Sequence, residues 1–191
     1  DMVLTDLPYG RTKATWDSVV PLEPLWAELL RVTKENAAIL LFGDGMFTAT
    51  LMMSKPSLWR YNLVWDRIHA SGFLNANRQP MRVHEDICVF YRKQPTYNSQ
   101  KVPGSKSHSR GANSKQKVNS LYGDFQAVDN TEEHGTLKHS TSIRSFQKPH
   151  PSVARHATEK PVLLLEWAVL SYTNPGEHVL DCTMGSGSTG L

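Results

Sequence analysis

Near the N-terminus the chain reads Met2-Val3-Leu4-Thr5-Asp6-Leu7-Pro8-Tyr9. The mainly apolar start of this stretch predicts a short buried strand over residues 2–6. A carboxylate, rigid backbone carbonyls and an aromatic ring follow at the end of that strand. Acceptors of this kind can hold a planar amino group while the ring stacks on the attached base. Taken alone, the tetrapeptide over residues 6–9 is equally compatible with a capping Asp followed by a Pro-Tyr turn.

A second stretch near the other end predicts a cofactor site. It reads Val179-Leu180-Asp181-Cys182-Thr183-Met184-Gly185-Ser186-Gly187, a predicted strand over residues 179–182 that runs into a glycine-rich turn. Residues 185–190 match the GxGxxG pattern of dinucleotide sites, which leaves a nicotinamide-dependent oxidoreductase open as an alternative. Asp181, however, suits a cofactor that carries an ammonium group, because a nearby carboxylate repels a pyrophosphate.

The two stretches together favour group transfer onto a nucleobase. An exocyclic amino group is a poor nucleophile because its lone pair is delocalised into the ring. The Asp6 carboxylate and the Leu7 carbonyl can accept its two protons and favour a pyramidal nitrogen. Positive charge builds on that nitrogen as a methyl group arrives, so a fixed carboxylate stabilises the transition state more than the ground state.

The pattern between these stretches predicts an α/β fold with a mostly parallel, doubly covered sheet. Strands are expected at residues 37–42, 61–66 and 86–91, the last two as an antiparallel hairpin at a sheet edge. Helices are expected from Pro24 to about residue 33, at 47–53 and at 161–170, each preceded or followed by a turn signal. The loop from Arg67 to His84 between the paired strands is polar and cationic, and its arginines are candidates for phosphate contacts.

The composition changes over residues 94–150, where polar residues dominate and apolar periodicity disappears. Eight Lys and Arg face four Asp and Glu between Lys101 and Lys148. A structureless loop of this length is unusual inside a compact domain. We expect either a disordered insertion or a target-recognition region, with residues 1–93 as the catalytic half and 151–191 as the cofactor-binding half of one domain.

Charge and cysteine usage limit the functional classes. The net charge is only +3, which is compatible with a nucleic-acid partner but does not require one. Cys88 and Cys182 fall in predicted strands, and we expect two reduced, buried thiols. The histidines show no ligand-like spacing with the cysteines, so no metal site is predicted. No apolar run approaches the roughly 18 residues that span a bilayer, and no signal peptide opens the chain, so a soluble cytoplasmic protein is expected.

The two ends predict a segment of a longer protein. The sequence begins at Asp1, directly before a strand, and ends at Leu191, where the glycine turn is expected to begin a helix. We therefore expect the sheet to be incomplete at its C-terminal side.

Two further motifs complete the pattern. The stretch His156-Ala157-Thr158-Glu159-Lys160-Pro161 precedes the cofactor turn, and His84-Glu85-Asp86-Ile87-Cys88-Val89-Phe90 forms a strand downstream of the catalytic one. With these motifs in this order, the chain resembles the amino-methylating DNA methyltransferases that use S-adenosylmethionine. Within them it is similar to the circularly permuted, beta-type group, in which the catalytic motif DPPY precedes the cofactor motif. The resemblance covers nearly the whole chain.

Several positions depart from the family pattern. Leu7 replaces the first proline of DPPY, Thr183-Met184 replace Phe-Ala, and Ala157 and Glu159 replace Pro and Gln. The carbonyl that the family uses at position 7 is present in any residue, so only some rigidity is expected to be lost. None of these changes indicates an inactive enzyme.

The resemblance implies a Rossmann-like sheet in which residues 179–182 form the first strand beside residues 2–6 as the fourth. It implies S-adenosylmethionine as cofactor and double-stranded DNA as substrate, with the target base flipped out of the duplex. The initial Asp favours adenine-N6 over cytosine-N4 methylation. A restriction endonuclease partner, a catalytically inactive DNA-binding module and the oligomeric state are left open.

The resemblance also assigns roles to individual residues. The catalytic residues it implies are Asp6, Leu7, Pro8 and Tyr9. The residues it implies for cofactor binding are Asp6, His156, Thr158, Lys160, Asp181, Thr183, Gly185, Ser186 and Gly187.

Overall fold

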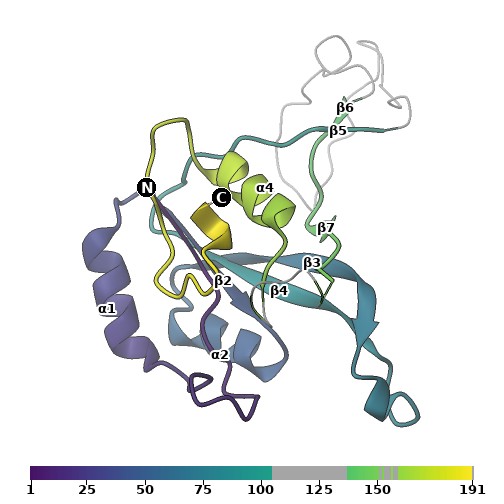
Figure 1. The fold of residues 1–191 in the computed structure, drawn as a ribbon. Coiled ribbons are helices and arrows are strands. Elements are labelled where there is room, and N and C mark those ends of the chain that lie inside the picture. The colour runs from purple at the N-terminus through teal and green to yellow at the C-terminus, as the bar shows by residue number, and fades with distance from the viewer. Residues whose placement is uncertain (105–136, 151, 153–155, 157–158, 191) are drawn as a thin grey trace, which may run out of the picture. The chain divides into compact units, whose positions relative to one another are not determined.

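The computed structural model describes the whole chain except residues 105–136, 151, 153–155, 157–158 and 191 (Figure 1). The chain divides into two compact units, of which the larger comprises Asp1–Asn98 with Thr141–Leu191 and the smaller comprises Ser99–Ser140. The larger unit contains both predicted motifs.

One sheet organises the larger unit, with its strands in the order β7-β3-β4-β2-β1-β8. The bounds are β1 Met2–Thr5, β2 Ala38–Gly43, β3 Trp59–Ser71, β4 Arg82–Phe90, β7 Ile143–Ser145 and β8 Val179–Leu180. The pairs β1–β2, β1–β8 and β3–β7 are parallel, whereas β4 pairs antiparallel with both β2 and β3. The predicted α/β class, the mostly parallel sheet and the antiparallel hairpin are therefore confirmed. The edge of the sheet beside the hairpin is formed by the short strand β7, which pairs with β3.

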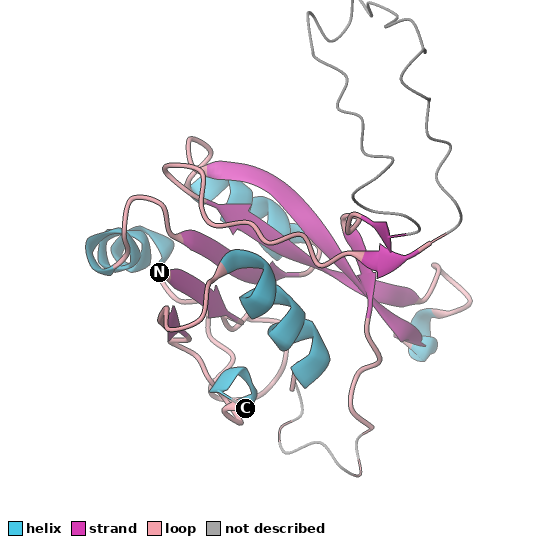
Figure 2. Cartoon of the chain, turned by 90° about the horizontal axis from the view of Figure 1, so that it is seen from above, coloured by secondary structure: helices cyan, strands magenta, loops and turns pink. Residues whose placement is uncertain are grey.

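Helices cover both faces of the sheet because the strands are apolar on both sides (Figure 2). The helices are α1 Leu22–Val32, α2 Met46–Ser54 and α4 Val162–Tyr172. Alternate strand residues such as Leu4 and Leu40 belong to the same core cluster as the apolar residues of α4. Their neighbours Val3 and Leu41 belong to the cluster formed with α1 and α2. The two-residue period of the strands thus distributes one apolar run between two helical layers.

Three tryptophans lie in the core, and the expectation of two buried cysteines holds for Cys88 alone. Trp26, Trp65 and Trp167 are buried. Cys88 lies within β4, where burial raises the pKa of its thiol to about 12. The prediction that Cys182 is buried is wrong, since this residue is exposed. The reason is that β8 ends at Leu180, two residues before the predicted end of the strand.

The paired strands β3 and β4 extend further than the apolar pattern predicted, at the expense of the cationic loop. Backbone pairing continues to Ser71 and Arg82, with an irregularity between Asp66 and Ser71. A short 3-10 helix, η1, follows over Phe73–Asn75. In this extension Arg67 donates to the Ser71 hydroxyl and to the Arg82 carbonyl, so the strands continue without an apolar face to mark them in the sequence.

The segment predicted as an insertion over residues 94–150 divides between the two units. Asn98 belongs to the larger unit, where its side-chain amide donates to the Thr173 carbonyl at 2.8 Å, beyond the end of α4. Strand β7 extends the main sheet. In the smaller unit, β5 Val102–Pro103 pairs with β6 Leu137–Lys138. The prediction of a disordered or target-recognition region falls largely on residues 105–136, which lie outside the described residues.

The described part of the chain contains no helix that is long and apolar enough to cross a membrane. Nor do its His, Cys, Asp and Glu side chains form a group of three or more that could hold a metal ion.

Candidate active site

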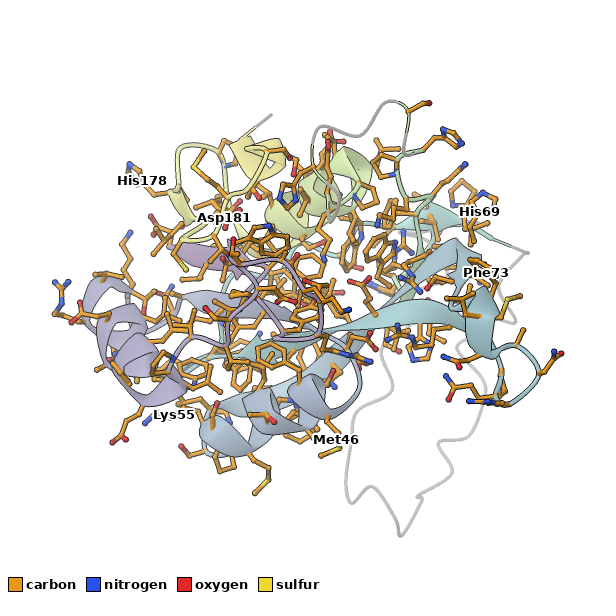
Figure 3. All side chains as sticks on the ribbon, turned by 60° about the horizontal axis from the view of Figure 1, so that its bottom comes forward. Met46, Lys55, His69, Phe73, His178 and Asp181 are labelled. Carbon is orange, nitrogen blue, oxygen red and sulfur yellow. The ribbon has the colours of Figure 1, made fainter. Side chains whose placement is uncertain are left out.

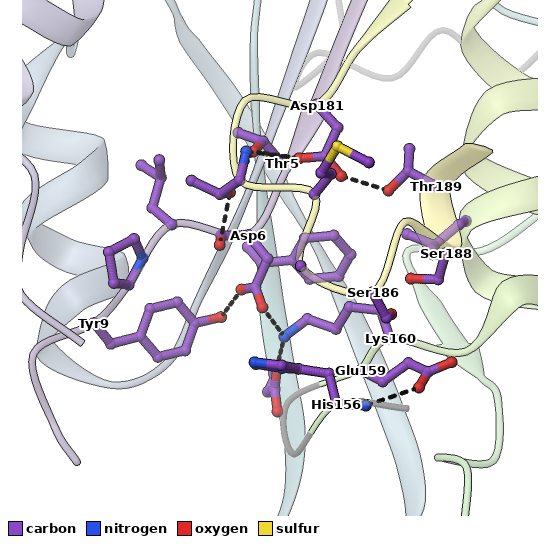
Figure 4. Close-up of a pocket in the computed structure, with 18 of the residues that line it drawn as sticks. Thr5, Asp6, Tyr9, His156, Glu159, Lys160, Asp181, Ser186, Ser188 and Thr189 are labelled. Atoms are coloured by element: carbon purple, nitrogen blue, oxygen red, sulfur yellow. Dashed lines mark hydrogen bonds and ion pairs between the residues drawn. The ribbon is translucent and has the colours of Figure 1, made fainter. Parts of the chain in front are cut away.

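The fold brings the two predicted motifs together, although they lie at opposite ends of the sequence. Because β1 and β8 are adjacent and parallel, Asp6 and Asp181 follow their strands at the same edge of the sheet. The Thr5 hydroxyl donates to Asp181 Oδ1 at 2.8 Å, and the Thr183 hydroxyl donates to the Asp6 carbonyl at 2.9 Å. Both motifs line one cavity of about 460 Å³ (Figure 4). This cavity is the candidate active site.

The Asp6 carboxylate occupies the middle of the site, with both oxygens engaged. The Tyr9 hydroxyl donates to Oδ1 at 2.8 Å, and the Lys160 ammonium donates to Oδ2 at 2.7 Å (Figure 4). Burial, followed by the Asp6 charge, raises the pKa of Tyr9 well above its ordinary value. Tyr9 is therefore a neutral donor at physiological pH. An ionised carboxylate offers about four lone-pair sites, so Asp6 can accept further hydrogen bonds from a ligand.

Lys160 belongs to a chain of alternating charges. Its ammonium lies 2.7 Å from Asp6 and 3.1 Å from Glu85 Oε2, and the Arg67 guanidinium lies 3.2 Å from Glu85 Oε1. Burial alone lowers the pKa of Lys160, but the carboxylates of Asp6 and Glu85 more than offset this, so the pKa is raised. Lys160 thus remains a cation although its side chain is only 9% exposed.

The glycine turn is organised around Asp181. Its Oδ1 accepts from the Thr183 backbone amide at 3.1 Å, and its Oδ2 accepts from the Thr189 hydroxyl at 2.6 Å. Gly185 and Gly187 adopt positive φ angles of 50° and 76°. These conformations are ones that glycine adopts without the cost imposed by a Cβ atom. The predicted cofactor turn is therefore held by its own carboxylate and opens onto the cavity.

We expect Gly185→Val to weaken binding of the cofactor about tenfold or more. A β-branched residue is strained at φ 50°, and relief of that strain displaces the turn from the cavity wall. Isothermal titration with S-adenosylmethionine measures the change. Gly176→Val provides the matched control, because Gly176 also has a positive φ, of 87°, but does not line the cavity. Equal affinity of the Gly185 variant and the wild type would contradict close backbone approach at this turn.

Most of the remaining predicted residues also line the cavity. Leu7, Pro8, Ser186 and His156 are among its lining residues, and Leu7 is also buried in the core cluster beneath α1 and α2. Thr158 lies outside the described residues. Gly187 is not among the lining residues, whereas the other described candidates meet at the cavity, and their roles toward ligands stay predictions.

The loop that follows Tyr9 is shaped by Asp17 and its neighbour Trp16. The Asp17 carboxylate accepts from the backbone amides of Gly10, Arg11 and Thr12 at 2.8, 2.9 and 2.6 Å. The Thr12 side chain, together with these amides, lowers the pKa of Asp17 to about 2. The Trp16 ring lies 5.3 Å from the His156 ring, between centroids. Trp16 and Asp17 of this loop thus line the cavity on the side of the Asp6–Tyr9 motif.

Sequence reasoning missed three residues of the site. Thr5 is buried at the end of β1 and links the two motifs, and its signal was a lone hydroxyl in an apolar run. Glu85 lines the cavity as the counter-ion of Lys160, although the sequence indicated it only as part of a strand motif. Lys148 also lines the cavity, and burial lowers its pKa. Its place in a polar segment far from either motif offered no signal.

Comparison with known proteins identifies the family. A family model described as DNA methylase, N6_N4_Mtase, matches residues 1–191. The chain is 23% identical over 206 residues to the Type II methyltransferase M1.MboII of Moraxella bovis, covering 100% of this chain and 78% of that protein. It is 26% identical over 200 residues to the Type II methyltransferase M.HpaI of Haemophilus parainfluenzae, covering 98% of this chain and 58% of that protein.

Solved structures share the fold. A crystal structure of the M1.HpyAVI–SAM complex aligns with a TM-score of 0.60 at 20% identity, over 100% of this chain and 76% of that one. The PvuII DNA methyltransferase, which is cytosine-N4-specific, aligns with a TM-score of 0.65 at 12% identity, over 99% of this chain and 69% of that one. Because the family model matches residues 1–191, this chain belongs to the DNA methylase family of N6 and N4 methyltransferases.

Proposed function

We propose that the protein moves a methyl group from S-adenosylmethionine to the N6 amino group of adenine in double-stranded DNA. The observation that carries the proposal is the shared cavity, which is lined both by the Asp6–Tyr9 motif and by residues of the glycine turn from Asp181 to Ser186. A structural relative is a complex with SAM, which supports this cofactor for the glycine turn. The proposed nucleophile and methyl donor would then meet within one cavity.

The reaction is a direct displacement. Adenine leaves the duplex at a cost of a few kcal/mol and enters the cavity. Tyr9 stacks on the base, while Asp6 and the Leu7 carbonyl orient its amino group. S-adenosylmethionine held at the Asp181–Gly185 turn would supply an electrophilic methyl group. As the amino nitrogen takes this group, the carbon–sulfur bond would break, S-adenosylhomocysteine would leave, and one of the two original amino protons would pass from the nitrogen to solvent. Alignment of this kind contributes up to about 7–11 kcal/mol in well-oriented systems.

The row of alternating charges formed by Asp6, Lys160, Glu85 and Arg67, called the charge chain below, determines how strongly Asp6 acts on the amino group. Lys160 alone would neutralise the carboxylate and repel the positive charge that develops on nitrogen. Because Glu85 shares the Lys160 cation and itself pairs with Arg67, the four groups are balanced in charge, and Lys160 is not neutralised by Asp6 alone. Glu85 therefore lessens the extent to which Lys160 cancels the negative charge that Asp6 presents to the base. Lys160 in turn holds the carboxylate in its orientation, a positioning role beyond its predicted cofactor contact.

No covalent intermediate is required by this displacement. Cys88 is buried within β4. The sulfur atom of Cys182 lies 3.6 Å from the Thr5 hydroxyl oxygen. Neither thiol is assigned a chemical step, and a nucleophilic cysteine is not part of the proposal.

The proposal is tested by incubating the full-length protein with duplex DNA and labelled S-adenosylmethionine, followed by nucleoside analysis. N6-methyladenine is the expected product. N4-methylcytosine would move the assignment to the cytosine branch, which keeps the same site and mechanism. Tight DNA binding without any methylated nucleoside would indicate a DNA-binding module that has lost catalysis. The names of the Type II relatives further support a restriction endonuclease as the biological counterpart.

Tyr9 variants test the proposed base-stacking role. We expect Tyr9→Phe to lower kcat about tenfold, since it loses only the hydrogen bond to Asp6. Tyr9→Ala should lose about a further tenfold, because base–aromatic stacking contributes about 1–3 kcal/mol. Single-turnover methylation measures both. Equal rates for the two variants would remove the ring from the base-binding role and leave only the hydroxyl.

A further inference from the structure

The hairpin formed by β3 and β4 ends in a tip, residues 68–81, that exposes large apolar side chains. Phe73 is 74% exposed and Leu74 is 84% exposed. Ile68 and Met81 are also exposed at the base of the tip. Adjacent apolar side chains in water are unfavourable, and such a patch often marks a binding surface. This one lies outside both core clusters.

The tip stands over the same edge of the sheet as the active site. In the sheet register Thr5, the residue before Asp6, is level with Leu41, which pairs with Cys88 of β4. Strand β4 begins six residues before Cys88, at Arg82. At about 3.3 Å per residue, the paired strands therefore extend about 20 Å beyond the end of β1. The hairpin projects from the sheet in Figure 1, and Figure 3 shows Phe73 at its end.

The hairpin is anchored to the charge chain of the active site. Arg67 donates to the Ser71 hydroxyl at 2.8 Å, to the Arg82 carbonyl at 2.9 Å and to Glu85 at 3.2 Å. Its side chain is only 11% exposed. The same Glu85 lines the catalytic cavity beside Lys160. The hairpin that carries the tip is thus linked through Arg67 to Glu85, a residue that lines the cavity.

The charge of the segment matches nucleic acid. Residues 67–84 contain three arginines and two histidines and no Asp or Glu. Arg78 is exposed next to the tip helix η1. Cations beside an exposed apolar pair fit a DNA duplex, in which phosphates flank stacked bases.

From these observations we propose that Phe73 and Leu74 form a wedge that enters the DNA duplex and fills the space left by the extruded target base. The proposal rests on the proposed function in taking DNA as the substrate and adds the element that stabilises the open duplex. Base extrusion sacrifices stacking on both neighbours, at a cost of a few kcal/mol. Apolar side chains inserted at that step restore contacts to the exposed base faces. The Arg78 guanidinium would meet a neighbouring phosphate.

The experiment compares the wild-type full-length protein with the double variant Phe73→Ala/Leu74→Ala. The probe is a synthetic duplex that carries the mapped methylation sequence with 2-aminopurine at the target position, whose fluorescence rises when it unstacks. A second duplex has an abasic site opposite the target, so that pairing is already lost. Methylation rates are measured on the matching adenine duplexes. Met53→Ala is the control, because Met53 is 73% exposed on α2 and lies outside the hairpin.

The wedge proposal predicts that the double variant loses base extrusion and methylation on the paired duplex but not on the abasic duplex. The double variant should lose about tenfold or more in fluorescence response and methylation rate on the paired duplex, and recover to within about twofold of the wild type on the abasic duplex. Undiminished extrusion on the paired duplex would overturn the proposal, as would equal loss on both duplexes. A changed sedimentation coefficient with normal extrusion would instead make the tip a contact between copies of the protein. Wild-type extrusion without methyl transfer would refute the proposed function and leave the wedge standing.

The variant changes exposed side chains only, so loss of folding is not expected, and circular dichroism checks it. The single variants Phe73→Ser and Leu74→Ser provide a second measurement. Each should lose part of the extrusion signal on the paired duplex if both side chains enter the step. Full extrusion by both single variants would also overturn the wedge.

Discussion

Asp6→Ala is expected to lower the rate of methyl transfer by at least about 10²–10³-fold. The variant removes the carboxylate that accepts hydrogen bonds from both Tyr9 and Lys160. The positive charge on the attacking nitrogen then has no fixed anion next to it. Lys160 keeps Glu85 as its counter-ion, 3.1 Å away, so the fold should survive the change. Single-turnover kinetics with saturating cofactor measure the chemical step directly.

Three comparisons make the Asp6 result specific. Glu166→Ala removes an exposed carboxylate from α4 and should leave the rate unchanged. Asp6→Asn preserves the shape of the side chain and removes its charge, so a loss close to that of alanine would assign the effect to electrostatics. Cofactor affinity is measured for each variant by titration. Substantial methylation by Asp6→Ala would mean that the carboxylate is wrongly assigned.

Lys160→Met is expected to destabilise the fold by about 3 kcal/mol at neutral pH. Removal of one partner from a buried ion pair leaves an uncompensated charge, and here two carboxylates remain close together without their shared cation. The side chain of Asp6 is 22% exposed and that of Glu85 is 13% exposed, so water partly solvates the two carboxylates left behind. The expected loss of stability therefore lies at the lower end of the range of about 3–5 kcal/mol for breaking a buried ion pair. Urea unfolding measures the change, and methylation should fall with it because Asp6 loses its orientation.

The pH dependence of this contribution has a definite sign. The pKa of Lys160 is raised in the folded state, so its stabilising effect is fully present below the pH at which a free lysine titrates. The effect is lost only as the pH rises through the higher folded-state value. The difference in stability between wild type and variant should therefore not shrink between neutral pH and about pH 9.

A surface lysine and a double variant provide the controls for Lys160. Lys93→Met removes an exposed cation that lies 3.8 Å from Glu35, and should change the free energy of unfolding by less than about 1 kcal/mol. Lys160→Met combined with Glu85→Gln removes one of the two repelling carboxylates and should recover part of the lost stability. If Lys160→Met were as mild as Lys93→Met, the buried charge chain would not support the fold.

Much of the fold was predictable from local sequence. Continuous apolar runs such as Ala38–Phe42 predict strands that are buried on both faces, and the structure places helices on both sides of them. Proline and glycine signals placed the helices to within a few residues, as for α4. The boundaries of β3 and β4 were less accurate, because their extension is stabilised by Arg67 and its partners and not by an apolar face.

The site was predictable only as two separate halves. The sequence by itself determined that a carboxylate and an aromatic ring end one strand, and that a glycine-rich turn follows another, since both depend on residues adjacent in the chain. Only the tertiary structure decided that Thr5 joins these halves and that Lys160 lies between Asp6 and Glu85. The partners in these contacts lie between 75 and 176 residues apart. Side chains so distant meet only through strand order and register, which no local pattern of residues specifies.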